Sequence, residues 1–308
     1  MIRSAWKGVL GAAAILVLAA CTPAASVVPS TGTSTGASAS AAASPVAVVP
    51  DDQLAFAGKL VVCIDIPYPP QEFFDENGNP TGADPDIATE IAKRLGLQIQ
   101  IENSVFDTII AAVTSGKCDI IISAQNLTAE RLQQVNMIPY FKAGQAFVVA
   151  KGNPEGIHEP LDLCGKSVAA EQGTTEVDYV RGDGDYKGKG LNKQCTDAGK
   201  PEVDMQEFQK DSDALLALTS GQVVAYFADS PVAGYYTVQQ PDQFELSGVT
   251  VEIANEGISV PKDKSGLADG VLAALKSMAE DGTYVEILKK YGLEDGAVDT
   301  SEMKIVTK

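Results

Sequence analysis

The stretch DTIIAAVTSGKCDIIISAQN, residues 107–126, contains one complete helix-to-strand unit. Residues 107–116 favour a helix with Asp107 as its N-cap and Gly116 as its stop. Residues 118–123 form an apolar run that is typical of a strand buried on both faces. The polar residues that follow stand at the carboxyl end of this strand. The stretch therefore predicts a helix–strand unit of an α/β sheet.

A similar pattern, SDALLALTSGQVVAYFADSP, occupies residues 212–231. Both stretches end a helix in Thr-Ser-Gly and continue into a strand and then polar residues, although two unrelated helix–strand units would look the same. Strand-like and helix-like runs alternate before and after each stretch, which predicts two parallel-sheet lobes. The expected strands are 59–65, 97–102, 118–123, 145–150, 167–170, 202–208 and 223–228.

The chain is expected to cross twice between the two lobes. Lobe 1 would combine residues 54–142 with residues 254–308, and lobe 2 would be the insertion 143–253. The crossing segments PYFKAGQ (139–145) and VEIANEG (251–257) are the expected hinges.

Composition excludes one large class of partners. The 308 residues are 45% hydrophobic and carry a formal net charge of −18. Nucleic acids are recognised through a basic surface, which this composition does not provide. We therefore expect no nucleic-acid partner.

The N-terminus is typical of an exported protein. Arg3 and Lys7 precede the apolar run VLGAAAILVLAA, which is too short for an ordinary membrane-spanning helix. Residues 1–20 are expected to be a signal peptide, and LAAC resembles the lipobox of bacterial lipoproteins, in which Cys21 receives the lipid. A plain secretory signal is the alternative. Residues 21–53 would then be a lipidated, disordered Ala/Ser/Thr/Pro tether that holds the protein at the outer face of the cell membrane.

Four further cysteines would lie in an oxidising compartment, where disulfides are stable. Three pairings are possible, and we favour two bridges. One would join two expected strands as neighbours, and the other would close a Gly/Lys/Asp-rich loop. The favoured pairs are Cys63 with Cys118 and Cys164 with Cys195. No metal site is expected, because C-x-x-C is absent and His158 is the only histidine.

The residues at the carboxyl ends of the expected strands are the candidate binding residues, because open α/β sheets bind ligands there. This set combines aromatic rings, hydroxyls, amides, one arginine and two acids, which suits a small polar zwitterion. The candidates are Asp65, Tyr68, Phe106, Ser123, Gln125, Asn126, Arg131, Thr174 and Asp229.

For three of these candidates the sequence indicates a specific binding role, beside an ordinary structural role where one exists. Arg131 can pair a carboxylate through two hydrogen bonds, or it can be a solvated helix arginine. The segment EQGTTE (171–176) opens a helix whose amides attract an anion, or it is simply a capped helix. With Ser230 as N-cap and Pro231 as first helical residue, Asp229 would be free to meet an ammonium group.

From about residue 59 to 295 the chain resembles the bacterial solute-binding proteins of family 3, which serve polar amino acid ABC importers. The resemblance rests on DIPYPPQEFFDENGNPTGADPDIATEIAKRLG, FDTIIAAVTSGKCDIIISAQNLTAER, PYFKAGQAFVVAKG, LDLCGKSVAAEQGTTE, GQVVAYFADSPVAGYY and AEDGTYVEILKKYG. It implies a two-lobed, type II periplasmic-binding-protein-like fold, a monomer that needs no cofactor, and a membrane permease as partner.

The resemblance also implies a role for individual residues. Arg131 would pair the α-carboxylate of an amino acid, assisted by Thr174, and Asp229 would pair its α-ammonium group. Tyr68 and Phe106 would sandwich the side chain of the ligand, with Asp65 near it.

The sequence departs from the family pattern at positions that would affect specificity. Gln125 and Asn126 stand where small or hydroxyl residues are usual, and Gln71 and Glu72 displace an expected aromatic residue to Phe73. The acids Asp65 and Glu72 would favour a cationic side chain, whereas the two amides would suit a polar amide.

Two other functions fit the same fold. A lyase or dehydratase that acts on a small carboxylic acid would need a placed acid or base, for which Asp65 or Glu72 could serve. His158 lies in the polar segment GNPEGIHEP and is expected to be a loop residue. A ligand sensor would act through a separate signalling protein.

Overall fold

The computed structural model describes residues 44–308. The predicted signal peptide, the lipidation of Cys21 and most of the predicted tether therefore lie outside the described residues. Within 44–308 no helix is both long enough and apolar enough to cross a membrane.

The described end of the predicted tether packs against the folded body. The Val46 backbone N–H donates to the Arg94 carbonyl at 2.9 Å, and Val49 is buried in a hydrophobic cluster. A short 3-10 turn follows at Asp51–Gln53. Residues 44–53 thus differ from the expected disordered segment, because Val49 gives this part of the chain apolar surface to bury.

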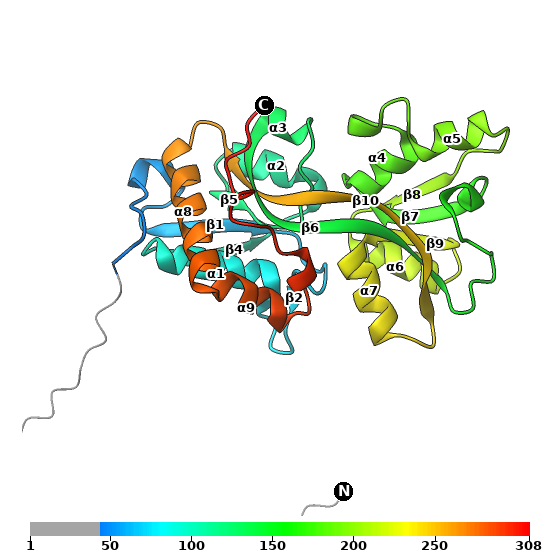
Figure 1. Ribbon diagram of the computed structural model, residues 1–308, viewed down its shortest axis with the longest axis horizontal. Helices are drawn as coiled ribbons and strands as arrows, with labels where there is room; N and C mark the ends of the chain where they lie inside the picture. Colours follow the sequence, from blue (N-terminus) through cyan, green and yellow to red (C-terminus); the bar gives the residue numbers. More distant parts are fainter. Residues whose placement is uncertain (1–43) are drawn as a thin grey trace, which may run out of the picture. The chain divides into compact units, whose positions relative to one another are not determined.

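Eight strands form one continuous hydrogen-bonded sheet in the order β4-β1-β5-β10-β6-β9-β7-β8 (Figure 1). The strands are β1 (Lys59–Ile64), β4 (Gln98–Asn103), β5 (Ile120–Ile121), β6 (Val135–Ala150), β7 (Ser167–Glu171), β8 (Asp204–Phe208), β9 (Ala225–Asp229) and β10 (Phe244–Pro261). A separate hairpin pairs β2 (Phe73–Phe74) with β3 (Pro80–Thr81).

Helices α1 to α7 lie between strands in sequence, as the alternating pattern predicts, and α8 and α9 follow the last strand. They are α1 (Ala83–Arg94), α2 (Phe106–Thr114), α3 (Arg131–Gln134), α4 (Thr175–Arg181), α5 (Leu191–Asp197), α6 (Asp211–Thr219), α7 (Ser230–Gln239), α8 (Ser265–Asp281) and α9 (Thr283–Lys290).

Two helix starts differ from the sequence-based expectation. Helix α2 begins at Phe106, so Asp107 lies inside the first turn and is not the N-cap. The Asp65 carboxylate instead accepts a hydrogen bond from the Phe106 N–H at 2.6 Å, which satisfies this helix start from a neighbouring strand end. Helix α7 begins at Ser230, which makes Asp229 its N-cap position.

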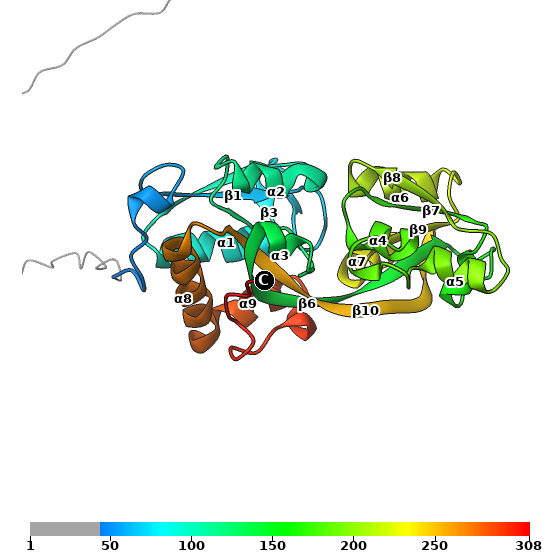
Figure 2. The same ribbon diagram turned by 90° about the horizontal axis from the view of Figure 1, so that it is seen from above.

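Lobe 1 contains β1, β4 and β5 with helices α1, α2, α3, α8 and α9. The alternating side chains of β1 divide between two hydrophobic clusters: Leu60 and Val62 pack on the side of α1, α8 and α9, and Val61 and Cys63 pack on the side of α2. The strand is thus buried on both faces. Figure 2 shows these helices on opposite sides of the strands.

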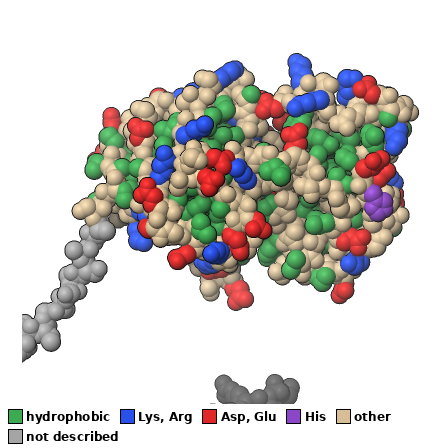
Figure 3. Space-filling view, in the orientation of Figure 1, with side chains coloured by type: hydrophobic (Ala, Val, Ile, Leu, Met, Phe, Trp, Pro, Cys, Tyr) green, Lys and Arg blue, Asp and Glu red, His purple; other side chains and the backbone are tan. Residues whose placement is uncertain are grey.

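Lobe 2 contains β7, β8 and β9 with helices α4 to α7, and it is built in the same way. Phe147 and Val149 of β6 pack in a cluster with α4 and α5, whereas Ala146 and Val148 pack in a cluster with α6 and α7. Figure 3 shows that acidic and basic side chains are interspersed on one face of both lobes.

The two longest strands connect the lobes (Figure 1). Strands β6 and β10 pair antiparallel, and their register places Ala143 opposite Ala254 and Phe141 opposite Glu256. The two segments expected to be hinges therefore lie side by side. Because the two crossing strands are paired, bending of one requires bending of the other.

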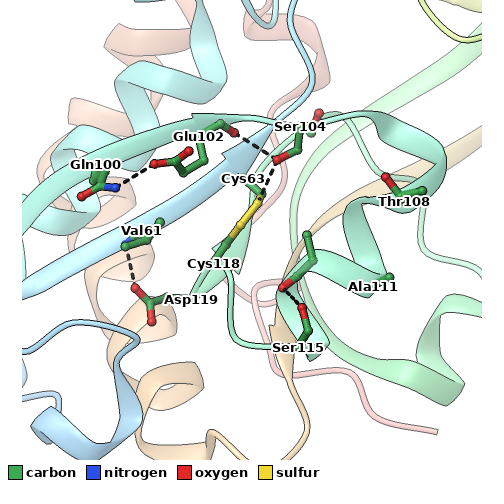
Figure 4. Close-up of a disulfide and its surroundings, with 12 residues drawn as sticks. Val61, Cys63, Gln100, Glu102, Ser104, Thr108, Ala111, Ser115, Cys118 and Asp119 are labelled. Carbon is green, nitrogen blue, oxygen red and sulfur yellow. Dashed lines mark hydrogen bonds between the residues drawn. A yellow bond between two sulfur atoms is a disulfide. The ribbon is translucent and has the colours of Figure 1, made fainter.

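The structure has two disulfides, Cys63–Cys118 and Cys164–Cys195. Figure 4 shows the first, which joins β1 to Cys118, two residues before the parallel neighbour β5. The Ser104 hydroxyl donates to the Cys63 sulfur at 3.1 Å. The second ties helix α5 to the turn that precedes β7. Each bridge lies within one lobe, so neither restrains the lobes relative to one another.

Candidate functional site

A cavity lies where the strand ends of the two lobes meet. Its lining comes from both lobes, which are in direct contact around it, and its volume is about 10 Å³, or room for about one water molecule. The lining residues are Asp65, Tyr68, Glu72, Phe106, Ser123, Ala124, Asn126, Arg131, Glu171, Thr174, Thr175, Glu176 and Asp229.

Arg131 is the one cationic residue of this lining. Its backbone N–H is held by the Thr128 hydroxyl at 3.1 Å, and its guanidinium lies 5.3 Å from the Phe106 ring. The guanidinium donates to the Asn126 carbonyl at 2.9 Å and to the Gly173 carbonyl, on the other lobe, at 3.0 Å. Arg131 is thus buried and held in one orientation. The two oxygens to which its guanidinium donates are neutral carbonyls, so its charge can still pair with a carboxylate.

Asp229 faces the cavity from lobe 2, at the end of β9. Its Oδ2 accepts a hydrogen bond from the Tyr68 hydroxyl at 3.0 Å, and its Oδ1 is buried with no hydrogen-bond partner among the described residues. Burial raises the pKa of the Asp229 carboxyl to about 6, against the lowering effect of its hydrogen bonds. A free carboxylate oxygen at this place can accept an ammonium group.

Asp65 belongs to a chain of hydrogen bonds at the end of β1. Its backbone N–H donates to the Ser123 hydroxyl at 2.9 Å, and that hydroxyl donates to Glu72 at 2.8 Å. Burial raises the pKa of the Asp65 carboxyl and holds that of the Glu72 carboxyl well above its usual range. Glu72 is 1% exposed, so its side chain does not point into water.

Eight of the nine candidates predicted from sequence line the cavity, and Gln125 does not. The Gln125 side chain accepts a hydrogen bond from the Ser259 hydroxyl of β10 at 2.8 Å, which turns it into the interior of lobe 1.

The Gln71–Glu72 pair divides between two environments. Glu72 lines the cavity, whereas the Gln71 amide donates to Glu256 on the crossing strand β10 at 2.5 Å. Phe73 lies outside the cavity, with its ring centroid 6.5 Å from that of Tyr235. The departure from the family pattern therefore affects both the cavity and the hinge.

Residues of lobe 2 that the sequence-based selection missed are Glu171, Thr175 and Glu176. Glu171 is the last residue of β7, and Glu176 lies in the first turn of α4. Both positions lie in the segment EQGTTE, so the strand-end rule that selected Thr174 would also have selected these acids.

Two of the missed residues are strongly perturbed acids. Burial, with Asp211 and Asp65 adding to it, raises the pKa of the Glu171 carboxyl to about 10. Burial and the neighbouring Asp229 hold the pKa of Glu176 well above its usual range. Glu171 lies among other acids, whereas the Arg131 guanidinium acts on Glu176 and opposes the rise of its pKa.

The fold and cavity together define a class of protein. Two lobes joined by a pair of crossing strands enclose a polar cavity at their strand ends, with a fixed arginine on one lobe and a carboxylate on the other. This is the arrangement of a two-lobed solute-binding protein of the type II periplasmic-binding-protein fold, as predicted from the sequence.

The chain belongs to the bacterial extracellular solute-binding proteins, family 3, which match it over residues 60–294. The arginine-binding protein ArgT of Corynebacterium glutamicum is 29% identical over 254 residues, which cover 82% of this chain and 80% of that protein. The ABC transporter glutamine-binding protein GlnH of Bacillus subtilis is 32% identical over 225 residues, which cover 72% of this chain and 76% of that protein.

Solved structures show the same fold. An ancestral arginine-binding protein bound to arginine is 38% identical, with a TM-score of 0.68, and the match covers 76% of this chain and 98% of that one. An ancestral arginine-binding protein bound to glutamine is 37% identical, with a TM-score of 0.67, and covers 76% and 97%. The same fold thus holds ligands with cationic and with neutral side chains in these relatives.

Proposed function

We propose that this protein is the ligand-binding subunit of an ABC importer. It captures a small amino acid or a related zwitterion by closing its two lobes and delivers it to a membrane permease. The observation that carries this proposal is the placement of Arg131 and Asp229 on opposite lobes at one cavity. The relatives described above are binding proteins by name, and one of them is named for an ABC transporter.

The two charged groups would hold the two charges that all α-amino acids share. Arg131 would pair the α-carboxylate, with Thr174 at the start of α4 beside it, and Asp229 would pair the α-ammonium group. Tyr68 and Phe106 would flank the ligand side chain. A ligand held between the lobes favours the closed state through the contacts that it makes only there.

Closure would bend the paired segments 139–145 and 251–257. Lobe 1 would then consist of residues 54–142 and 254–308, and lobe 2 of residues 143–253. We further propose that the protein acts as a monomer at the outer face of the cell membrane, held by a lipid on Cys21 after removal of residues 1–20.

We propose binding without catalysis. An ancestral amino acid-binding protein described as a precursor of cyclohexadienyl dehydratase is 32% identical, with a TM-score of 0.65 and coverage of 76% of this chain and 95% of that one. That ancestor is thus described as a binding protein. Incubation with small carboxylic acids, followed by product analysis, should show no turnover by this protein.

Calorimetry tests the site. A thermal-shift screen of the twenty amino acids first identifies a ligand, because a ligand that binds only the folded state raises its stability. Arg131→Gln and Asp229→Asn should each reduce the affinity for that ligand by about 30-fold or more, since breaking a buried charged contact costs about 2–5 kcal/mol. Arg181→Gln is the matched control, because Arg181 lies on α4 and pairs with Glu207 away from the cavity. Unchanged affinity in both cavity variants would refute the assignment.

A further inference from the structure

The cavity has far more acids than one amino acid backbone requires. Five of its lining side chains are carboxylic acids, namely Asp65, Glu72, Glu171, Glu176 and Asp229, and Arg131 is the one cation. Each of these acids is at least nine-tenths buried. A buried carboxylate is stable only with a cation or strong donors beside it, and otherwise it takes up a proton.

Buried polar atoms without hydrogen-bond partners also indicate that the cavity requires a hydrogen-bond donor. Among residues 44–308, every buried side-chain polar atom without a hydrogen-bond partner is a carboxyl or amide oxygen. Three of these oxygens belong to cavity residues with carboxyl groups, Glu72, Glu176 and Asp229. Such groups in a folded protein call for an explanation, and a donor-rich ligand supplies one.

Four of the five cavity acids form two pairs, and the fifth, Glu72, accepts a hydrogen bond from the Ser123 hydroxyl. Asp229 and Glu176 lie near the guanidinium of Arg131, whose charge acts on both. Asp65 and Glu171 line the same cavity from opposite lobes, at the ends of β1 and β7, and the nearby Asp65 contributes to the raised pKa of Glu171. Asp65 is fixed by the Phe106 N–H, and Glu171 accepts a hydrogen bond from the Asp211 N–H at 3.1 Å.

We infer that the ligand carries a second positive charge on its side chain, and that Asp65 and Glu171 hold this charge between the two lobes. The inference rests on the proposed function, in which Arg131 and Asp229 hold the α-groups. The ligand class is an α-amino acid whose side chain ends in a guanidinium or an ammonium group. Glu171, which the selection from sequence did not include, is then a residue that determines specificity.

A cation between these acids removes the cost of closing the cleft. When lobe 2 meets lobe 1, Glu171 is brought against Asp65, and closing without a cation requires one of the pair to hold a proton. A guanidinium donates to both carboxylates at once through its planar fork. A neutral side chain of the same shape leaves the repulsion in place, so it should close the lobes less well.

Lys210 is the cationic residue whose charge lowers the pKa of Asp65. It lies at the start of α6, is half-buried, and lowers the pKa of Asp65 less than the Phe106 hydrogen bond does. No ion pair of Lys210 occurs within the part of the chain described by the structure. It therefore does not neutralise the two acids, which leaves this role to the ligand.

The test compares ligands that differ in charge and little in shape. Calorimetry on the full chain measures arginine against citrulline, which replaces the guanidinium with a neutral ureido group, and lysine against glutamine. In the wild type, arginine or lysine should bind about 100-fold more tightly than its neutral counterpart, a ratio typical of a buried charge pair. Glu171→Gln should reduce this ratio by about tenfold or more and leave the affinity for the neutral ligand nearly unchanged.

Two further variants complete the test. Asp65→Asn removes the negative charge that lobe 1 contributes and keeps an acceptor for the Phe106 N–H. It should therefore also reduce the ratio of cationic to neutral ligand affinity. Glu207→Gln, on the neighbouring strand β8 and paired with Arg181, should leave the ratio unchanged. Neutral ligands that bind the wild type as tightly as cationic ones would overturn the inference while the proposed function stands. Binding of no amino acid at all would overturn both.

Discussion

Tyr68 and Asp229 join the two lobes through hydrogen bonds that share one phenol oxygen. The Tyr68 hydroxyl donates to Asp229 Oδ2 at 3.0 Å and accepts from the Asp229 backbone N–H at 2.9 Å. Tyr68 follows β1 of lobe 1, and Asp229 ends β9 of lobe 2. Both residues are buried, so the contact connects the strand ends of the two lobes without competing water.

Removing this contact should favour the open conformation. Tyr68→Phe keeps the ring and deletes both hydrogen bonds, and a hydrogen bond to a charged group is worth about 1.5–3 kcal/mol. Affinity for the ligand should therefore fall by about tenfold or more. Small-angle X-ray scattering should show a larger radius of gyration for the ligand-free variant than for the wild type. Equal radii and equal affinities would show that Tyr68 does not hold the lobes together.

Gly173 should be required for full closure of the cleft. It has a φ of +81°, and a Cβ at this position would meet the Asp107 Cα of lobe 1 at 3.0 Å. Gly173→Ala should reduce ligand affinity by about tenfold, because backbone on the opposite lobe must move. Gly199→Ala is the matched control, since Gly199 has a φ of +69° and no neighbour within 4 Å of the added Cβ. That variant should lose about 1–2 kcal/mol of stability and keep its affinity.

The ligand-free protein should become less stable as the pH rises from 5 to 8. The pKa of Glu171 is about 10 in the closed structure and 4.5 when unperturbed, so the folded state binds more protons than the unfolded state. The contribution of Glu171 to the free energy of unfolding is fully present below pH 4.5 and is lost as the pH rises toward 10. The loss is no more than about 1.4 kcal/mol per pH unit.

Urea unfolding at several pH values measures this dependence. Glu171→Gln should reduce the slope, because the neutral amide does not titrate. Asp211, Asp65 and, more distantly, Lys210 are the charged groups around this site, and none of them is altered by the substitution. A saturating cationic ligand should also reduce the slope. An identical pH dependence in wild type and variant would contradict the prediction.

Glu256 should destabilise the hinge when it is ionised. It lies on the crossing strand β10 and is fully buried, and burial, with Asp229 and Asp84 adding to it, raises the pKa of its carboxyl well above the usual range. Glu256→Gln should therefore raise the melting temperature at pH 8 and leave it nearly unchanged at pH 5. The amide oxygen can still accept the hydrogen bond from Gln71.

A surface acid on the same strand provides the control for Glu256. Glu245 forms an ion pair with Lys151 at 3.5 Å, and its side chain is 32% exposed. Exposed pairs are worth about 0–1 kcal/mol, so Glu245→Gln should change the melting temperature little at either pH. If the Glu256→Gln variant melts at the same temperature as the wild type at pH 8, ionisation of Glu256 does not destabilise the protein at that pH.

Much of the cavity could be found from the sequence because strand ends are a local feature. The run that ends at Ser123 and the run before Ser230 each mark where a strand stops, and parallel strands bring their carboxyl ends to one edge. Arg131 and Asp229 could therefore be selected without knowledge of their separation in space. Glu171 directly follows the expected strand 167–170 and was missed because Thr174 alone was selected from the segment EQGTTE.

Other features depended on contacts between distant segments. Asp107 was expected to cap α2, but Asp65 does so from 41 residues earlier in the chain. Gln125 was expected in the cavity, but its contact with Ser259 of β10 turns it away. Local propensity does not encode these partners, because each one is supplied by a strand that pairs nearby only in the folded sheet.

The sequence alone determined the alternation of strands and helices, the two lobes and the set of polar strand ends, because hydrophobic periodicity and turn residues act over a few residues. Tertiary structure decided which of these strand ends face each other. It placed Glu171 against Asp65 and Tyr68 against Asp229, across lobes that the chain crosses twice. The protonation of the buried acids follows from that placement, because desolvation and charge repulsion depend on distance in space.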